Sequence, residues 1–108
     1  MAIAWMYLII AGLFEAVWAI GLKYAEGFTK FWPSVITIVA MAISLYFLAL
    51  AIKTLPLGTA YAVWTGIGAF TTAILGVVLF SEPIHFSRIF FLLLLLVSII
   101  GLKFTAAN

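Results

Sequence analysis

A single acidic side chain, Glu15, lies deep within the first of four long apolar runs in the sequence. If residues 3–22 form a helical span, a rise of about 1.5 Å per residue puts Glu15 only about 4 Å from its midpoint. A carboxyl group at that depth costs roughly 2.5–3.5 kcal/mol on insertion scales, so it usually serves a substrate, an ion or a proton. Glu15 is therefore our candidate for a shared proton and cation site. The alternative is a protonated, hydrogen-bonded structural acid.

Small, aromatic and hydroxylated residues recur at helical spacing around this acid and in the next two runs. Residues three and four apart share a helix face, which puts Gly12, Glu15 and Trp18 in one stripe. If one face of each of the three runs converges, the result is a pocket with one acid, three aromatic rings and several hydroxyls. The other members of this predicted pocket are Thr37, Met41 and Ser44 in the second run, and Tyr61, Trp64, Thr65 and Gly68 in the third.

The pocket favours cation chemistry because no Lys, Arg or His lies inside a span to neutralise Glu15. Its charge must be met by a proton or by a bound cation, and a site that faces the two sides alternately then performs antiport. Trp18 and Trp64 can add cation–π attraction of up to about 2 kcal/mol. Tyr61 and Ser44 can hydrogen-bond the carboxylate or the substrate. Interfacial anchoring, the alternative role for aromatic residues, suits rings near the span ends better than Trp18 and Trp64.

Composition identifies the elements that must position these residues. Of the 108 residues, 69% are hydrophobic and 7% are charged, which indicates a membrane protein. At about 20 apolar residues per crossing, the chain holds four spans, predicted at 3–22, 33–52, 58–80 and 87–103. We predict an all-α membrane protein in which residues 1–108 form a single domain of four transmembrane helices. We also expect the first span to be retained, since no positively charged segment precedes it.

The same composition argues against most other functions. With no cysteine, the chain offers no disulfide, thiol nucleophile or thiolate metal site. It also lacks a nucleotide-binding loop and a nucleophilic triad, so we expect neither an enzyme nor a cofactor. A net charge of +2 without a basic cluster gives no reason to expect nucleic acid as a partner. His85 lies in a polar turn, where a solvated histidine is the expected reading rather than a metal ligand.

Glycine and small residues mark two further features. Gly66 and Gly68 lower the cost of bending the third span, since each glycine disfavours helix by about 1 kcal/mol relative to alanine. We interpret them as a conformational hinge, with close helix packing as the alternative. In the fourth span, Ser98 and Gly101 are small enough to let another helix approach, so we expect a dimer contact there. Contact with lipid is the alternative for part of that face.

Positive charges are divided almost evenly between the two sides of the membrane. The first and third connections share one side and carry Lys23, Lys30 and Arg88. The second connection and the C-terminus share the other side, with Lys53, Lys103 and the N-terminal amine. The positive-inside rule therefore gives little preference for either orientation. This balance permits a chain that inserts both ways and pairs with its own inverted copy.

Four segments resemble the small multidrug resistance family of four-span bacterial transporters, and the resemblance covers essentially the whole chain. They are Gly12-Leu-Phe-Glu-Ala-Val-Trp18, Gly27-Phe-Thr-Lys-Phe-Trp-Pro-Ser34, Lys53-Thr-Leu-Pro-Leu-Gly-Thr-Ala-Tyr-Ala-Val-Trp-Thr-Gly-Ile-Gly68 and Ile99-Ile-Gly-Leu-Lys103. Trp18, one turn after Glu15, and the Lys53-Thr-Leu-Pro stretch resemble the guanidinium-exporter subtype. The broad multidrug subtype usually has a small residue in place of this tryptophan.

The resemblance implies an antiparallel, dual-topology homodimer in the bacterial inner membrane that exchanges about two protons for one guanidinium ion. Carried over by position, Glu15 is the shared proton and substrate site, and Trp18, Ser44, Tyr61 and Trp64 surround it. Gly12 borders the carboxylate, Gly66 and Gly68 match the bend of the third helix, and Lys103 matches a basic residue of the fourth. Ser98 stands where the family has a glycine in its helix-four dimer contact.

Three functions are compatible with the sequence. Proton-coupled export of guanidinium and small substituted guanidines is the first, because a planar guanidinium can donate two parallel N–H groups to one carboxylate. Proton-coupled export of quaternary ammonium ions and other drugs is the second. A small membrane subunit with no transport of its own is the third.

Overall fold

The computed structural model describes residues 2–105 and contains four long helices. They are α1 (Ala2–Ala25), α2 (Phe31–Ala51), α3 (Leu57–Phe80) and α4 (Phe86–Thr105). Each has 20 to 24 residues and is long and apolar enough to cross a membrane. The four predicted helices are therefore confirmed. Helix α1 continues past residue 22, the predicted end of the first span, because the first left-handed residue, Glu26 at φ 48°, comes only after Ala25.

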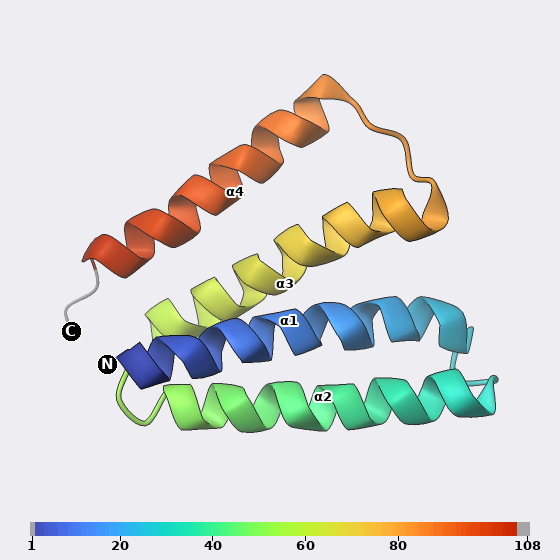
Figure 1. The fold of residues 1–108 in the computed structure, drawn as a ribbon, viewed down its shortest axis with the longest axis horizontal. Helices are drawn as coiled ribbons and strands as arrows, with labels where there is room; N and C mark the ends of the chain where they lie inside the picture. The colour runs from blue at the N-terminus through green and yellow to red at the C-terminus, as the bar shows by residue number, and fades with distance from the viewer. Residues whose placement is uncertain (1, 106–108) are drawn as a thin grey trace.

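The helices are arranged as a thin slab (Figure 1). Helices α1 and α2 form an antiparallel hairpin, α3 packs mainly on α1, and α4 packs mainly on α3, with Lys103 of α4 also over the Trp5 ring of α1. The Cα trace measures 43 × 34 × 17 Å, so at its thinnest the slab is little more than one or two helices deep. One chain therefore leaves broad helix faces without protein contact.

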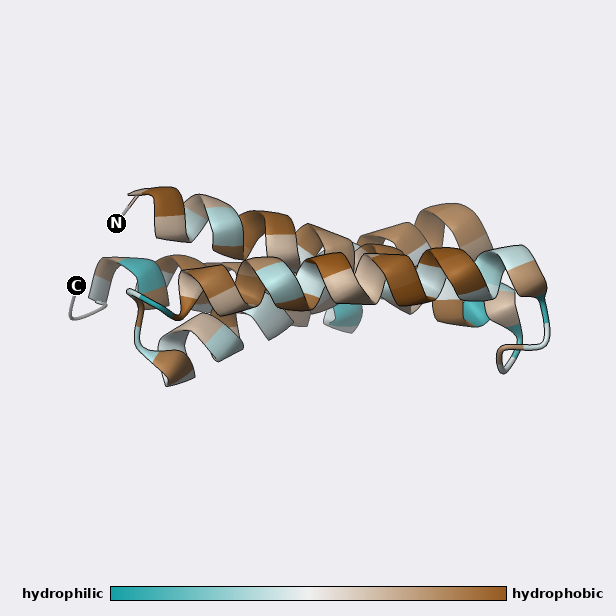
Figure 2. Ribbon diagram, turned by 90° about the horizontal axis from the view of Figure 1, so that it is seen from below, coloured by the Kyte–Doolittle hydropathy of each residue, from teal (hydrophilic) through white to brown (hydrophobic). Residues whose placement is uncertain are grey.

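Those faces are apolar. Figure 2 shows hydrophobic colours along the helices and hydrophilic colours mainly towards the ends and connections. Large side chains such as Ile38, Val78 and Phe91 are more than half exposed, which is the expected environment of residues that face lipid. Four spans of this composition identify a multi-pass membrane protein.

Small residues bring the helices together. A Cβ built on Gly21 of α1 would overlap Thr37 of α2, and one built on Gly66 of α3 would lie 3.0 Å from Ile99 of α4. Without a strong hydrophobic force between helices in lipid, close backbone approach at such residues is the main source of packing energy. The core, which includes Leu8 and Val63, lies towards the N-terminal end of α1.

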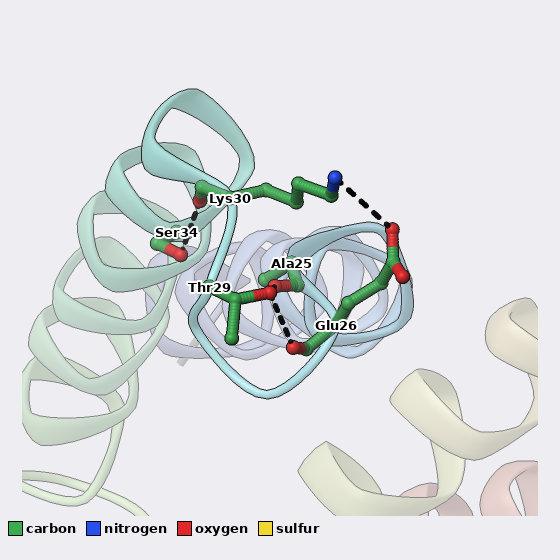
Figure 3. Close-up of polar contacts among 5 residues, drawn as sticks. All are labelled: Ala25, Glu26, Thr29, Lys30 and Ser34. Atoms are coloured by element: carbon green, nitrogen blue, oxygen red, sulfur yellow. Dashed lines mark hydrogen bonds and ion pairs between the residues drawn. The ribbon is translucent and has the colours of Figure 1, made fainter.

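The connection between α1 and α2 is held by local bonds (Figure 3). The Thr29 hydroxyl donates to the Glu26 carbonyl at 2.8 Å, and the Ser34 hydroxyl donates to the Lys30 carbonyl. Lys30 and Glu26 also form an exposed ion pair at 4.0 Å. Such a pair contributes less than about 1 kcal/mol. This connection and the one between α3 and α4 lie at the same end of the slab (Figure 1).

Candidate functional site

Glu15 lies on the face of α1 that meets α3. Its side chain is half-buried, and its Oε1 atom is buried without a hydrogen-bond partner among the described residues. Neither of the two ion pairs found within residues 2–105 involves this carboxyl group. A buried oxygen without a donor is costly, because it has lost water and gained nothing in return. The carboxyl group is thus available to a proton, a cation or a group from outside this chain.

Gly68 of α3 provides the space for this carboxyl group. A Cβ built on Gly68 would lie 2.8 Å from Glu15 Cγ and would overlap the carboxyl group itself. Gly12, one turn before Glu15, faces Ile67 of α3 in the same way. A Cβ built on Gly12 would lie 2.7 Å from the Cβ of Ile67. Each helix therefore carries a glycine where the other presents a side chain, and this fixes the Glu15 side chain between α1 and α3.

One helical turn from the contact between Glu15 and Gly68, a chain of hydrogen bonds joins α1, α2 and α3. The Ser44 hydroxyl donates to the Ala11 carbonyl at 2.7 Å and accepts from Trp64 Nε1 at 3.0 Å. Ser44 is fully buried and Trp64 is 7% exposed. Because Ala11 and Glu15 are four residues apart, as are Trp64 and Gly68, the chain and the carboxyl group lie on successive turns of the same helix contact. In this structure the Ser44 proton is directed at the backbone.

Three further residues of the predicted pocket take no part in this hydrogen-bond chain. Tyr61 is 55% exposed, and its ring centroid is 5.3 Å from that of Trp64. Trp18 is half-buried, and its Nε1 atom has no hydrogen-bond partner in the described part of the chain. Met41 is half-buried on α2. The structure thus joins Glu15 to Gly68 and Ser44 to Trp64, places Tyr61 against the Trp64 ring, and gives neither Trp18 nor Met41 a polar contact.

The glycines predicted as a hinge both lie at helix contacts. Helix α3 is continuous from Leu57 to Phe80. Gly66 faces α4 and Gly68 faces Glu15. The two glycines therefore allow close packing in this conformation, and a hinge at the same position stays a prediction.

The predicted dimer-contact residues lie on an open face of α4. No residue of α4 is buried in the described chain. The Ser98 hydroxyl donates to the Leu94 carbonyl of its own helix at 2.8 Å. A Cβ built on Gly101 would meet no described atom within 4 Å. Within residues 2–105, Ser98 is thus exposed and position 101 has open space for a side chain.

Two features of the site had no counterpart in the sequence reading. Ile67 opposes Gly12, and its position one residue before Gly68 is a signal that the sequence analysis did not use. Arg88 bonds both Glu82, at 3.0 Å, and the Ala73 carbonyl, at 2.8 Å. These two Arg88 hydrogen bonds depend on the course of the connection between α3 and α4, which no periodic sequence pattern predicts. Within residues 2–105, no group of three or more potential metal-ligating side chains occurs.

Comparison with known proteins places this geometry in context. The family described as Small Multidrug Resistance protein matches residues 3–95. A protein of Yersinia pseudotuberculosis named Guanidinium exporter is 62% identical over 100 residues, which cover 93% of this chain and 96% of that protein. The Guanidinium exporter of Escherichia coli K12 is 56% identical, over 93% of this chain and 95% of its own length. That of Salmonella typhimurium is 54% identical over 103 residues, which cover 95% and 98% of the two chains.

Proposed function

The chain belongs to the small multidrug resistance family, and from this premise we propose that it exports guanidinium and small substituted guanidines in exchange for protons. The observation that carries the proposal is the position of Glu15. Its carboxyl group is seated against Gly68 between two membrane helices, with one buried oxygen unpartnered and no counterion among the described residues.

The chemistry of a carboxylate in this position suits guanidinium. Two parallel N–H groups of the planar cation can meet the two oxygens of Glu15 in a fork, and the charges cancel in a setting of low dielectric constant. When the cation leaves, a proton must replace it, because an uncompensated carboxylate within the bilayer is costly. Proton and guanidinium therefore compete for one group, and a site that opens to the two sides in turn exchanges them.

The surrounding aromatic residues support the same substrate class. The paired rings of Trp64 and Tyr61 offer π-faces on one helix, and a desolvated cation gains up to about 2 kcal/mol over such a ring. The unpartnered Nε1–H of Trp18 can donate to a carboxylate. Ser44 acts in this proposal by fixing Trp64. Gly12 and Met41 complete the wall, and Gly66 and Gly68 are the points about which α3 bends during the exchange.

We further propose that the transporter is an antiparallel, dual-topology homodimer in the bacterial inner membrane. The thin slab and the unburied α4 leave broad faces of a single chain without protein contact. A second, inverted copy that packs on Ser98 and Gly101 covers part of these faces and contributes a second Glu15. The near-equal numbers of positive charges on the two sides of the membrane are consistent with insertion in both orientations.

The test is guanidinium uptake into proteoliposomes driven by a pH gradient. Wild type is expected to transport and Glu15→Gln to give no flux above protein-free vesicles. Glu26→Gln, which changes an exposed loop acid, is the matched control and is expected to retain wild-type flux. Transport of a bulky aromatic dye without guanidinium would reverse the substrate assignment in favour of drug export. Identical null flux for wild type and Glu15→Gln would indicate a subunit that does not transport.

A further inference from the structure

A cavity lies between α1 and α3, beyond the Glu15 site. Its volume is about 380 Å³. Ala19 is four residues after Glu15, and Thr72 is four residues after Gly68, so the cavity begins one helical turn from the contact between Glu15 and Gly68. It ends at Lys23, Phe80 and Glu82, near the ends of α1 and α3. We call it the α1–α3 cavity; its walls are formed by Ala19, Ile20, Lys23, Ala69, Thr72, Ala73, Gly76, Phe80 and Glu82.

Several polar groups line the α1–α3 cavity, as they do a groove between α1 and α2 that includes Tyr7, Lys53 and Thr54. The Thr72 hydroxyl lies along the wall of the α1–α3 cavity, and Lys23 and Glu82 lie at its outer end. By contrast, a groove between α3 and α4 has Arg88 as its one polar lining residue. Cavities with several polar partners hold water, whereas apolar ones stay dry or fill with hydrocarbon. A volume of this size has room for on the order of ten water molecules.

Charged side chains with defined contacts lie at the mouth of the cavity. Glu82 sits over Gly76, where a built Cβ would lie 2.8 Å from its Cδ. Its carboxylate accepts a hydrogen bond from Arg88 at 3.0 Å, and the same Arg88 nitrogen donates to the Ala73 carbonyl at 2.8 Å. Lys23 places its Nζ 5.1 Å from the Phe80 ring centroid. One acid and two bases therefore leave this mouth with a net positive charge.

We propose that the α1–α3 cavity is a water-filled passage through which protons reach Glu15 from this end of the protein. Water can pass a proton along a hydrogen-bonded chain, and two small residues form the inner end of the cavity: Ala19, one helical turn from Glu15, and Ala69, next to Gly68 in the chain. The net positive mouth repels cations of every kind, because like charges repel in a setting of reduced dielectric constant. Glu82 lowers this positive charge and positions Arg88 against α3.

The function of the passage depends on the antiport proposed above, but its hydration does not. It can be tested by thiol labelling, because the natural chain has no cysteine. Single-cysteine variants of the full chain in proteoliposomes are treated with membrane-impermeant methanethiosulfonates, one anionic and one cationic. Thr72→Cys and Ala69→Cys probe the cavity. Ile74→Cys, two residues from Thr72 on the groove between α3 and α4, is the control at equal depth. Thr29→Cys, in an exposed loop, is the reference.

We expect Thr72→Cys to react roughly tenfold or more faster than Ile74→Cys, since thiols that face lipid have no water in which to ionise. Relative to Thr29→Cys, the anionic reagent should be favoured over the cationic one. Adding Glu82→Gln should increase that preference by making the mouth more positive. Equal, slow labelling of Thr72→Cys, Ala69→Cys and Ile74→Cys would overturn the passage. A charge preference that Glu82→Gln leaves unchanged would overturn the role of Glu82.

Flux measurements separate this inference from the proposed function. If wild type carries no guanidinium while Thr72→Cys is labelled rapidly, the antiport proposal fails and the hydrated cavity stands. If guanidinium exchange is normal but the cavity is not labelled, the passage fails and protons reach Glu15 by another route. Gel-filtration profiles of each variant show that the labelled protein is folded, so slow reaction cannot be attributed to aggregation.

Discussion

The carboxyl group of Glu15 on α1 occupies the space that a side chain at position 68 of α3 would fill. A Cβ on Gly68 would be 2.8 Å from Glu15 Cγ and nearer still to the carboxyl group. The Glu15 carboxyl group can lie there because Gly68 has no side chain. Any side chain at position 68 must move the carboxyl group or push the two helices apart.

The first prediction therefore concerns Gly68→Ala. We expect the rate of guanidinium exchange to fall by about tenfold or more, which corresponds to a rise of ~1.4 kcal/mol in the activation free energy of exchange. The measurement is proteoliposome flux at equal amounts of reconstituted protein. Gly58→Ala is the control, because a Cβ there meets no described atom within 4 Å, and alanine favours a helix. Wild-type exchange by Gly68→Ala would show that the position of the acid in this structure is not the one that functions.

The second prediction concerns Ser44, which links α1 to Trp64. In Ser44→Ala the buried indole N–H loses its acceptor, and an unpaired buried donor costs about 1–3 kcal/mol. We expect a lower midpoint of thermal unfolding in detergent and a weaker apparent guanidinium affinity, because the Trp64 ring is free to turn. Ser34→Ala removes a hydroxyl that is bonded within the exposed first turn of α2. It should change neither the unfolding midpoint nor the guanidinium affinity. If Ser44→Ala binds guanidinium as tightly as wild type, Trp64 needs no fixed orientation.

The elements of this fold were predictable because each apolar run ends at a residue that interrupts a helix. Pro56 precedes α3, and Gly27, with φ 73°, follows α1. The end of the first helix was the least accurate of these predictions. Hydropathy falls at Lys23, but the backbone stays helical to Ala25, since a charged side chain near the membrane surface does not prevent helix formation.

The candidate site was predictable only within single helices. Periodicity put Gly12, Glu15 and Trp18 on one face, but it does not say which face of one helix meets which face of another. The contact of Glu15 with Gly68 and the bond from Ser44 to the Ala11 carbonyl depend on that choice. The pairing of Arg88 with Glu82 depends on an irregular connection in which Ser81 is left-handed. Such contacts follow from tertiary packing and leave no repeat in the sequence.

The third prediction is a pH dependence of guanidinium binding. If proton and cation share Glu15, lowering the pH raises the occupancy of the proton and weakens the apparent guanidinium affinity. By linkage, the dissociation constant rises by up to about tenfold per pH unit for each proton displaced. Calorimetry in buffers of different ionisation enthalpy measures the protons released on binding. Glu26→Gln should behave as wild type, and an affinity independent of pH would exclude direct competition.

The fourth prediction separates packing from bending at Gly66. In this structure a Cβ at Gly66 would press on Ile99, with two side-chain atoms at 3.0 Å. If packing is what matters, Gly66→Ala lowers flux and the double variant with Ile99→Ala regains it, because the neighbour has been shortened. If bending is what matters, the second substitution restores nothing. Flux of both single variants and of the double variant decides between the two roles.

The fifth prediction tests the surface of α4 that one chain leaves open. Within the described chain nothing lies within 4 Å of a Cβ at Gly101, so Gly101→Leu should not disturb the fold of a single copy. If a second copy packs closely there, the larger side chain must separate the two helices. We expect Gly101→Leu to lower the fraction of dimer measured by light scattering in detergent, and to lower guanidinium flux with it. Gly58→Leu makes the same change at another open position and should leave both unchanged. A full complement of dimer in Gly101→Leu would mean that the contact lies elsewhere on the slab.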